Sequence, residues 1–257
     1  MFQQIQLKLF VISLLLFFFS IRNIYSQNNK SCHVKNSSTY DGELINYSVY
    51  YTFAGVYVPA GEASFSTTYN NNKGNPAFYL TGKGSTYSSY DWFFKVRDFY
   101  ESIVDTATML PFQFIRNISE GKNKLNSKTI FDRKEKSATY NTTKISISEC
   151  THDVLSMIYY ARNIDYTQSK AGDMIPYDLY LDGKVYSLYM RFMGKQVVKT
   201  KYGTFSCFII KPKLIEGTIF RGGEEMTVYV SDDKRKIPIY IETPIIVGKI
   251  KVYYIPN

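Results

Sequence analysis

Short segments that alternate apolar and polar residues run through almost the whole chain, from Leu44 to Ile255. Leu44 to Phe53 has the strongest pattern, and Glu62 to Tyr69 is followed, after an Asn-rich turn, by a partner in Ala77 to Tyr87. Such alternation predicts half-buried strands, and two such segments around a turn predict a hairpin. The other predicted strands are Asp98 to Val104, Phe112 to Ile118, Lys128 to Phe131, Ser137 to Tyr140, Asp173 to Leu181, Lys184 to Arg191, Lys195 to Thr200, Thr204 to Lys211, Glu225 to Val230, Ile237 to Glu242 and Ile245 to Ile255.

One segment, Thr151 to Asn163, has the period of a helix instead. Its apolar residues share one helical face: Val154, Leu155, Ile158 and Tyr159. Either Thr151 or Asp153 can cap the helix, because their side-chain oxygens accept hydrogen bonds from first-turn amides. A single helix within a series of strands is expected to cover one face of the sheet or to plug an open barrel.

The turns organise these elements into one domain. Asp182-Gly183 lies between two predicted strands and predicts a type I′ hairpin, whereas Val56 to Gly61 predicts a turn-rich connection. We find no linker that would separate two domains, so residues 40–257 form a single β-rich domain after a flexible lead-in, residues 27–39. The predicted fold is mainly β, an antiparallel curved sheet forming an open barrel or sandwich, with one main helix at about 151–163.

The first 26 residues have the layout of a secretory signal peptide: Lys8, an apolar run from Leu9 to Phe19, and a polar exit. The run is shorter than the roughly 20 residues that span a bilayer, so we expect cleavage after Ser26. Two alternatives stay open, an uncleaved anchor and a lipoprotein modified at Cys32. The prediction is an exported protein of the periplasm or outer envelope.

Charge narrows the classes of partner. Removal of the leader leaves 29 basic and 22 acidic residues, a net charge of +7, which favours acidic partners such as lipid head groups or anionic glycans. Export from the cytoplasm argues against a nucleic acid as the partner. The 24 tyrosines favour strands and also suit ligand grooves, because the ring is apolar and its tip is polar.

Three cysteines, Cys32, Cys150 and Cys207, allow at most one disulfide in an oxidising compartment. The sequence does not determine which two would pair. Burial in the core is the common fate of a lone cysteine.

Metal and nucleophile motifs are weak. The two histidines, His33 and His152, lack the spacing of metal ligands, so neither a metal nor another cofactor is expected. Cys150 and His152 are two residues apart at the predicted helix start, a position more typical of a capping region than of a catalytic pair. Gly82-Lys83-Gly84-Ser85 lies within a strand pattern and lacks the spacing of a phosphate loop.

The charged cluster from Arg97 to Ser102 is the most interesting candidate site. On a strand, Asp98 and Tyr100 share one face and Arg97 lies on the other. We interpret the cluster mainly as a buried arginine–carboxylate pair that fixes register, and the alternative is that Arg97, Asp98 and Tyr100 bind a ligand. No residue is assigned a catalytic role.

Four stretches together resemble the exported bacterial family of domain of unknown function (DUF) 3108. They are Tyr40-Asp41-Gly42-Glu43-Leu44 with Pro59-Ala60-Gly61-Glu62-Ala63, Val96-Arg97-Asp98-Phe99-Tyr100-Glu101-Ser102 with Leu110-Pro111, Asp153 to Arg162, and Asp232 to Ile239 with Gly248-Lys249-Ile250. The resemblance implies a signal peptide, an envelope location and a β-rich domain, and no catalytic residues. The layout is similar to periplasmic lipoprotein-carrier folds, which is an analogy of fold alone.

Three functional hypotheses follow. The leading one is a non-enzymatic envelope protein that binds an apolar or amphipathic ligand, such as a lipid or lipoprotein, and can contact the membrane surface. The others are a structural or assembly protein of the envelope that pairs through strand edges, and a glycan-binding or glycan-cleaving protein. The sequence defines neither the ligand nor the oligomeric state.

Overall fold

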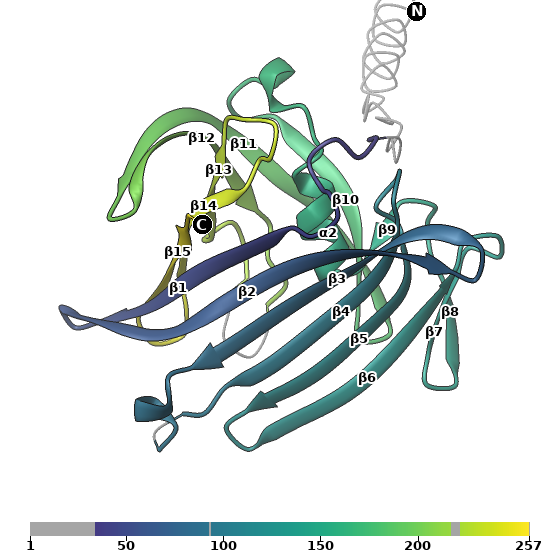
Figure 1. The fold of residues 1–257 in the computed structure, drawn as a ribbon, viewed down its shortest axis with the longest axis horizontal. Helices are drawn as coiled ribbons and strands as arrows, with labels where there is room; N and C mark the ends of the chain where they lie inside the picture. The colour runs from purple at the N-terminus through teal and green to yellow at the C-terminus, as the bar shows by residue number, and fades with distance from the viewer. Residues whose placement is uncertain (1–33, 93, 217–221, 257) are drawn as a thin grey trace, which may run out of the picture. The chain divides into compact units, whose positions relative to one another are not determined.

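The computed structural model describes residues 34–92, 94–216 and 222–256, which form one curved fifteen-stranded sheet, the helix α2 (Val154–Ala161) and the 3-10 helices η1 (Ser88–Tyr90) and η2 (Tyr166–Gln168) (Figure 1). The strands are β1 (Leu44–Phe53), β2 (Val56–Asn72), β3 (Asn75–Thr86), β4 (Arg97–Asp105), β5 (Pro111–Glu120), β6 (Asn123–Asp132), β7 (Ser137–Tyr140), β8 (Thr143–Ser146), β9 (Thr151–His152), β10 (Met174–Leu181), β11 (Lys184–Thr200), β12 (Gly203–Pro212), β13 (Thr227–Ser231), β14 (Pro238–Pro244) and β15 (Lys249–Ile255). The predicted mainly β fold with one main helix is confirmed.

The sheet consists of two runs of strands, β1–β8 and β9–β15, and within each run the strands that are consecutive in the chain lie side by side. Its order is β8-β7-β6-β5-β4-β3-β2-β1-β15-β14-β13-β12-β11-β10-β9, and the two runs meet where β1 pairs antiparallel with β15. Tyr47 lies opposite Tyr254 at this junction. The sheet is not closed into a barrel, because no ladder joins β8 to β9 among the described strands.

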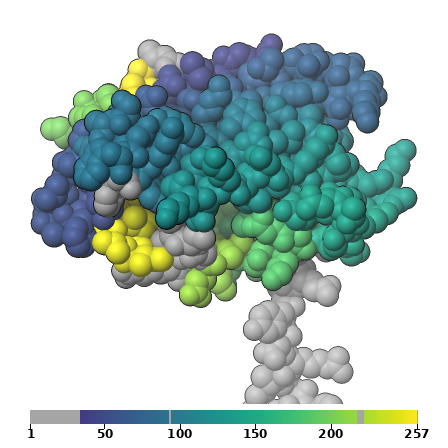
Figure 2. All heavy atoms as spheres, turned by 90° about the horizontal axis from the view of Figure 1, so that it is seen from below, coloured from purple at the N-terminus to yellow at the C-terminus, as the bar shows by residue number. Residues whose placement is uncertain are grey.

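The two edge strands of the sheet, β8 and β9, are consecutive in the chain and are separated by residues 147–150. Five backbone steps reach at most about 18 Å, so the edges lie near each other. Side chains bridge this seam, by which we mean the junction of β5–β8 with β9–β10. The rings of Phe131 and Tyr180 pack edge to face at 5.4 Å, and Ser148 donates a hydrogen bond of 2.6 Å to Asp178. The green β10–β11 region lies against the teal strands in Figure 2.

Helix α2 packs against β3, β4, β9 and β10, and its buried apolar residues belong to the larger hydrophobic core. Asp153 caps the helix: its carboxylate accepts from the amides of Leu155 and Ser156 at 2.8 and 2.9 Å. Ser156 Oγ in turn accepts from the amide of Asp153 at 3.0 Å, which completes a capping box. The helix is shorter than predicted because Thr151 and His152 pair with β10 as the parallel strand β9.

A buried ion pair fixes the other end of α2. Arg162 donates two hydrogen bonds of 2.8 Å to Glu43, and a third of 3.0 Å to the carbonyl of Ser38. Asn163 accepts from the amides of Ser37 and Ser38. The segment before β1 is therefore bound to the helix end, so the described part of the predicted flexible lead-in, residues 34–39, is held in place.

The local sequence pattern predicted one turn correctly and one connection incorrectly. Asp182 and Gly183 both have positive φ, +50° and +74°, which confirms the predicted type I′ hairpin. The prediction of a turn-rich connection at Val56 to Gly61 is wrong, because these residues form the first part of β2. Pro59 is accommodated there because the register with β1 shifts at this point: Val49 faces Gly61 and Tyr50 faces Pro59.

Candidate functional site

The structure separates the residues of the predicted ligand cluster. Arg97 is exposed and pairs with Asp91 at 2.8 Å, so the expected buried arginine–carboxylate pair within the cluster is wrong. Arg97 and Asp98 are adjacent on β4 and therefore point to opposite faces of the sheet. Asp98 and Tyr100 do share a face, as predicted. A ligand-binding role of these residues stays a prediction.

Asp98 instead lies beside a second carboxyl group. It accepts a hydrogen bond of 3.0 Å from the amide of Ser119, and its side chain hydrogen-bonds to Glu120. Burial raises the pKa of Asp98, and burial together with the charge of Asp98 raises the pKa of Glu120. Burial also raises the pKa of Tyr100 to about 12. Two carboxyl groups in direct contact suit a shared proton, whereas a glycosidase holds them about 5–9.5 Å apart.

Cys150 and His152 do not form a nucleophile–base pair. Cys150 is disulfide-bonded and Cys207 is a free, buried thiol, while Cys32 lies outside the described residues. His152 is buried against the ring of Tyr160 at 4.5 Å, and neither ring nitrogen has a hydrogen-bond partner among the described residues. Burial lowers the pKa of His152 to about 3, so the imidazole is neutral at physiological pH.

A ladder of tyrosines that the sequence pattern did not predict crosses five neighbouring strands. Its members, on β13, β14, β15, β1 and β2, are Tyr229, Tyr240, Tyr253, Tyr50 and Tyr57. Direct pairing places Tyr229 opposite Tyr240 and Tyr240 opposite Tyr253. Three contacts are stacked, with ring centroids 4.7 to 5.3 Å apart, and that between Tyr253 and Tyr50 is edge to face at 5.7 Å.

We call the surface formed by these five rings the tyrosine face. Tyr253 precedes the core residue Tyr254 in β15 and points to the other side of the sheet, whereas Tyr229 and Tyr240 also pack against the hydrophobic cluster that contains Tyr254. Stacked rings cover one another's flat sides and leave the ring edges for other contacts. The hydroxyls are themselves linked, since Tyr240 and Tyr57 each hydrogen-bond to Tyr253. The surface is therefore both aromatic and polar.

Charged groups lie beside the tyrosine face, next to Tyr240 and next to Tyr50. Glu242 accepts from Tyr240, and its carboxylate is 3.2 Å from Lys249 Nζ and 3.4 Å from Lys251 Nζ. The hydroxyl of Tyr240 and the two lysines lower the pKa of Glu242 although burial alone would raise it. Lys201 lies over the ring of Tyr50, on β1, at 4.7 Å and hydrogen-bonds to its hydroxyl.

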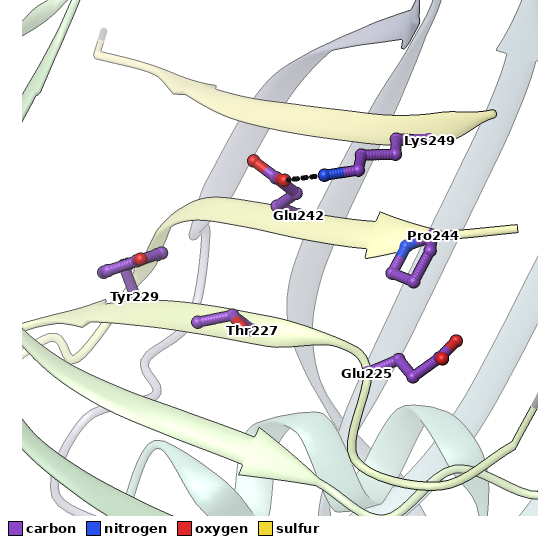
Figure 3. Close-up of a pocket in the computed structure, with 6 residues that line it drawn as sticks. All are labelled: Glu225, Thr227, Tyr229, Glu242, Pro244 and Lys249. Carbon is purple, nitrogen blue, oxygen red and sulfur yellow. Dashed lines mark hydrogen bonds and ion pairs between the residues drawn. The ribbon is translucent and has the colours of Figure 1, made fainter. Parts of the chain in front are cut away.

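A shallow depression of about 380 Å³ lies beside Tyr229 (Figure 3). Its lining comes from three strands and the residues before β13, and consists of Glu225, Thr227, Tyr229, Glu242, Pro244 and Lys249. The picture shows Glu242 reaching Lys249 across β14 and β15. Two carboxylates, one amine, a hydroxyl and a ring thus surround one small volume.

The described residues hold no group of three or more His, Cys, Asp or Glu side chains that could bind a metal ion. None of the helices in the same part of the chain is long and apolar enough to cross a membrane.

The fold and the site define a structural class of protein, a mainly β protein whose curved sheet carries a capped helix and a polar aromatic face. The chain belongs to the family described as "Protein of unknown function (DUF3108)", whose sequence model matches residues 46–254, so the resemblance seen in the sequence is confirmed. A search of curated proteins gives no match.

A solved structure with a similar fold shows what this chain resembles. It is the "Beta-barrel-like Protein of Domain of Unknown Function DUF1849 from Brucella abortus", which matches with a TM-score of 0.53 and 8% sequence identity over 82% of this chain and 95% of that chain. At this identity the likeness concerns the fold alone.

Proposed function

We propose that this protein is a non-enzymatic binding protein of the cell envelope that holds an amphipathic ligand with an anionic head group on its tyrosine face. The observation that carries the proposal is the tyrosine ladder with lysines beside it. The ring edges offer apolar contact, the hydroxyls donate and accept hydrogen bonds, and the lysines supply donors for a phosphate or carboxylate. A net positive charge supports an acidic ligand.

We place the site on the tyrosine face because the larger hydrophobic core leaves no room for a ligand around helix α2. Helix α2 and a buried aromatic cluster, which includes Tyr159, Tyr166 and Phe208, occupy the side on which a carrier would hold an acyl chain. The depression beside Tyr229 is the size of a head group: small-ligand pockets measure about 300–1,000 Å³, and this one is at the low end. The apolar part of the ligand would then lie along the rings.

The depression also supports a second candidate, an acidic glycan. Glu225, Glu242 and Thr227 lie beside the ring of Tyr229, and such a mixture of acceptors, a hydroxyl and an aromatic ring suits a sugar. Cleavage of the glycan is less well supported, since the Asp98–Glu120 pair lacks the carboxyl separation of known glycosidase mechanisms.

Calorimetric titration with a short-chain phosphatidylglycerol below its micelle concentration tests the leading proposal. Lys249→Met removes the amine at the depression, and we expect about tenfold weaker binding because a charge-assisted hydrogen bond is lost. Lys144→Met is the matched control, since Lys144 is equally exposed and also pairs with a glutamate, Glu135, far from this face. Equal affinities of the two variants would contradict the assignment.

The same titration with an acidic trisaccharide separates the two ligand classes. Binding of the sugar, and not of the lipid, with the same loss in Lys249→Met would replace the leading proposal by the second. Tyr229→Leu, compared with Tyr69→Leu elsewhere on the surface, tests whether the ring contributes in either case.

The envelope location is a separate part of the proposal and rests on the leader sequence. We expect the protein in the envelope fraction of the cell, with an intact mass that begins at Gln27. A cytoplasmic protein that keeps residues 1–26 would contradict it.

A further inference from the structure

Two neighbouring turns at one end of the sheet expose apolar side chains. In the β1–β2 turn, Phe53 is 52% and Val56 is 58% exposed, and in the β14–β15 loop, Ile246 is 57% and Val247 is 51% exposed. Residues 53–57 and 244–248 contain no charged residue. Turns are normally polar, and clustered exposed apolar side chains mark an interaction surface. We call these four side chains the apolar tips.

The two turns are held next to each other. The hydroxyl of Tyr51 donates a hydrogen bond of 3.0 Å to the carbonyl of Val247, and Thr52 pairs with Lys249 in the β1–β15 ladder. At Gly248 the backbone approaches so closely that an added Cβ would lie 2.4 Å from the carbonyl oxygen of Thr52. The apolar tips therefore form one fixed patch.

The shape of the patch argues against a complementary protein pocket. β2 begins at Val56, whereas its pairing with β3 begins at Gly61, so residues 56–60 extend beyond the neighbouring strand. Figure 1 shows the β1–β2 turn projecting at the end of the molecule. A convex apolar tip enters a soft medium such as a bilayer, whereas protein interfaces usually bury their anchors in well-packed pockets.

Behind the apolar tips, aromatic and basic side chains lie at one level of the sheet, as they do at the head-group level of a membrane. Tyr57 and Lys249 both lie opposite Thr52 in the sheet, Lys251 lies opposite Tyr50, and Lys201 lies over the ring of Tyr50. Aromatic residues with a polar tip concentrate at the head-group level of bilayers, and lysines attract anionic lipids. This combination, and the excess of basic over acidic residues in the chain, identify an anionic bilayer as the occupant.

We propose that the apolar tips dock this protein on the surface of an anionic lipid bilayer, with Phe53, Val56, Ile246 and Val247 inserted below the head groups. None of these four side chains lines the depression beside Tyr229, which adjoins the β14–β15 loop at Pro244 and Lys249. The inference goes beyond the proposed function, because a bilayer surface can be bound whether or not the tyrosine face holds a ligand.

Vesicle flotation tests the docking. The purified protein, with its N-terminus defined by intact mass and every variant in the same form, is floated with vesicles of phosphatidylcholine alone or with phosphatidylglycerol. We expect stronger binding to the anionic vesicles, and about tenfold weaker binding for the double variant Phe53→Ser/Val56→Ser. Val197→Ser is the matched control, because Val197 is 65% exposed but lies on β11.

A spectroscopic readout keeps the test independent of folding defects. The chain has one tryptophan, Trp92, so Trp92→Phe/Val56→Trp carries a single reporter at a tip. We expect its emission to shift to the blue on anionic vesicles and to be quenched by brominated lipid. An unshifted emission, or variants that lose self-association rather than vesicle binding, would overturn the proposal, and the latter would identify a second copy of the chain as the occupant. Short-chain lipid binding at Lys249 is measured separately, so either proposal can fail alone.

Discussion

Arg162 and Glu43 are 119 positions apart in the chain and form a bidentate ion pair in which both side chains are fully buried. Arg162 also donates to the carbonyl of Ser38 and, through Nε, to that of Arg235 at 3.1 Å. One guanidinium group thus joins the end of α2, the segment before β1 and the β13–β14 turn.

Removal of one partner of this pair is expected to be strongly destabilising. Glu43→Ala leaves the Arg162 guanidinium buried without its carboxylate, which costs about 3–5 kcal/mol of unfolding free energy. The double variant Glu43→Leu/Arg162→Met removes both charges and should lose less. Urea unfolding followed by circular dichroism measures both, and a double variant as unstable as the single one would show that the pair does more than neutralise itself.

His152 predicts a loss of stability in acid. Its pKa is about 3 in the folded protein, because burial disfavours the imidazolium, and about 6.5 in the unfolded chain. The unfolded chain therefore binds the additional proton between these values. This contribution to stability is present above pH 6.5 and is lost as the pH falls toward 3, at about 1.4 kcal/mol per pH unit.

Asp153 acts in the opposite direction. Burial raises its pKa to about 6 although Ser102 donates a hydrogen bond of 2.6 Å to the carboxylate. Its contribution is greatest below the unfolded pKa of about 3.9 and is lost as the pH rises through 6.

We expect His152→Phe to become more stable between pH 6 and 4, relative to the wild type. Parallel pH profiles of the two proteins in urea unfolding would contradict the assignment to His152.

The seam should depend on its rings more than on its charges. Phe131→Ala removes a buried ring that packs on Tyr180, and we expect a loss of about 3–5 kcal/mol. Asp182→Asn weakens the ion pair with Arg116 but keeps an acceptor and a residue suited to the turn. Because Asp182 is 54% exposed, this change should cost less than about 1 kcal/mol. Thermal unfolding of both variants tests the order.

Cys207 is expected to resist alkylation in the folded protein. The thiol is buried on β12, and burial raises its pKa to about 11, so little thiolate forms at pH 8. Mass spectrometry after brief iodoacetamide treatment should find Cys207 unmodified in the native protein and modified in urea. Rapid labelling of the native protein would show that β12 opens locally.

Local sequence rules predicted the parts of this structure that local physics determines. Alternation identified most strands, Asp182-Gly183 identified its turn, and Asp153 was one of two candidates for the helix cap. Arg97 was assigned the wrong role because its partner, Asp91, comes from the β3–β4 connection and not from its own strand.

The tyrosine face could not be predicted in the same way. It depends on a β1–β15 pairing that places Tyr253 beside Tyr50, and no periodicity within one strand contains that register. The abundance of tyrosine was a compositional signal of such a surface, but it did not indicate where the rings would gather. The ion pair of Glu43 with Arg162 likewise could not be predicted from the sequence, although both residues lie in the stretches that resemble the family.

The β1–β15 junction also has a kinetic consequence. β1 to β8 can pair step by step as the chain emerges, and so can β9 to β15, because in each run every strand lies beside a chain neighbour. The pairing of Asn46 with Ile255 must close a loop of nearly the whole domain. Contacts of such high sequence separation slow folding, so we expect the two halves to form early and to join late. Until the seven-residue strand β15 pairs with β1, the edge of β1 in the first half remains uncovered.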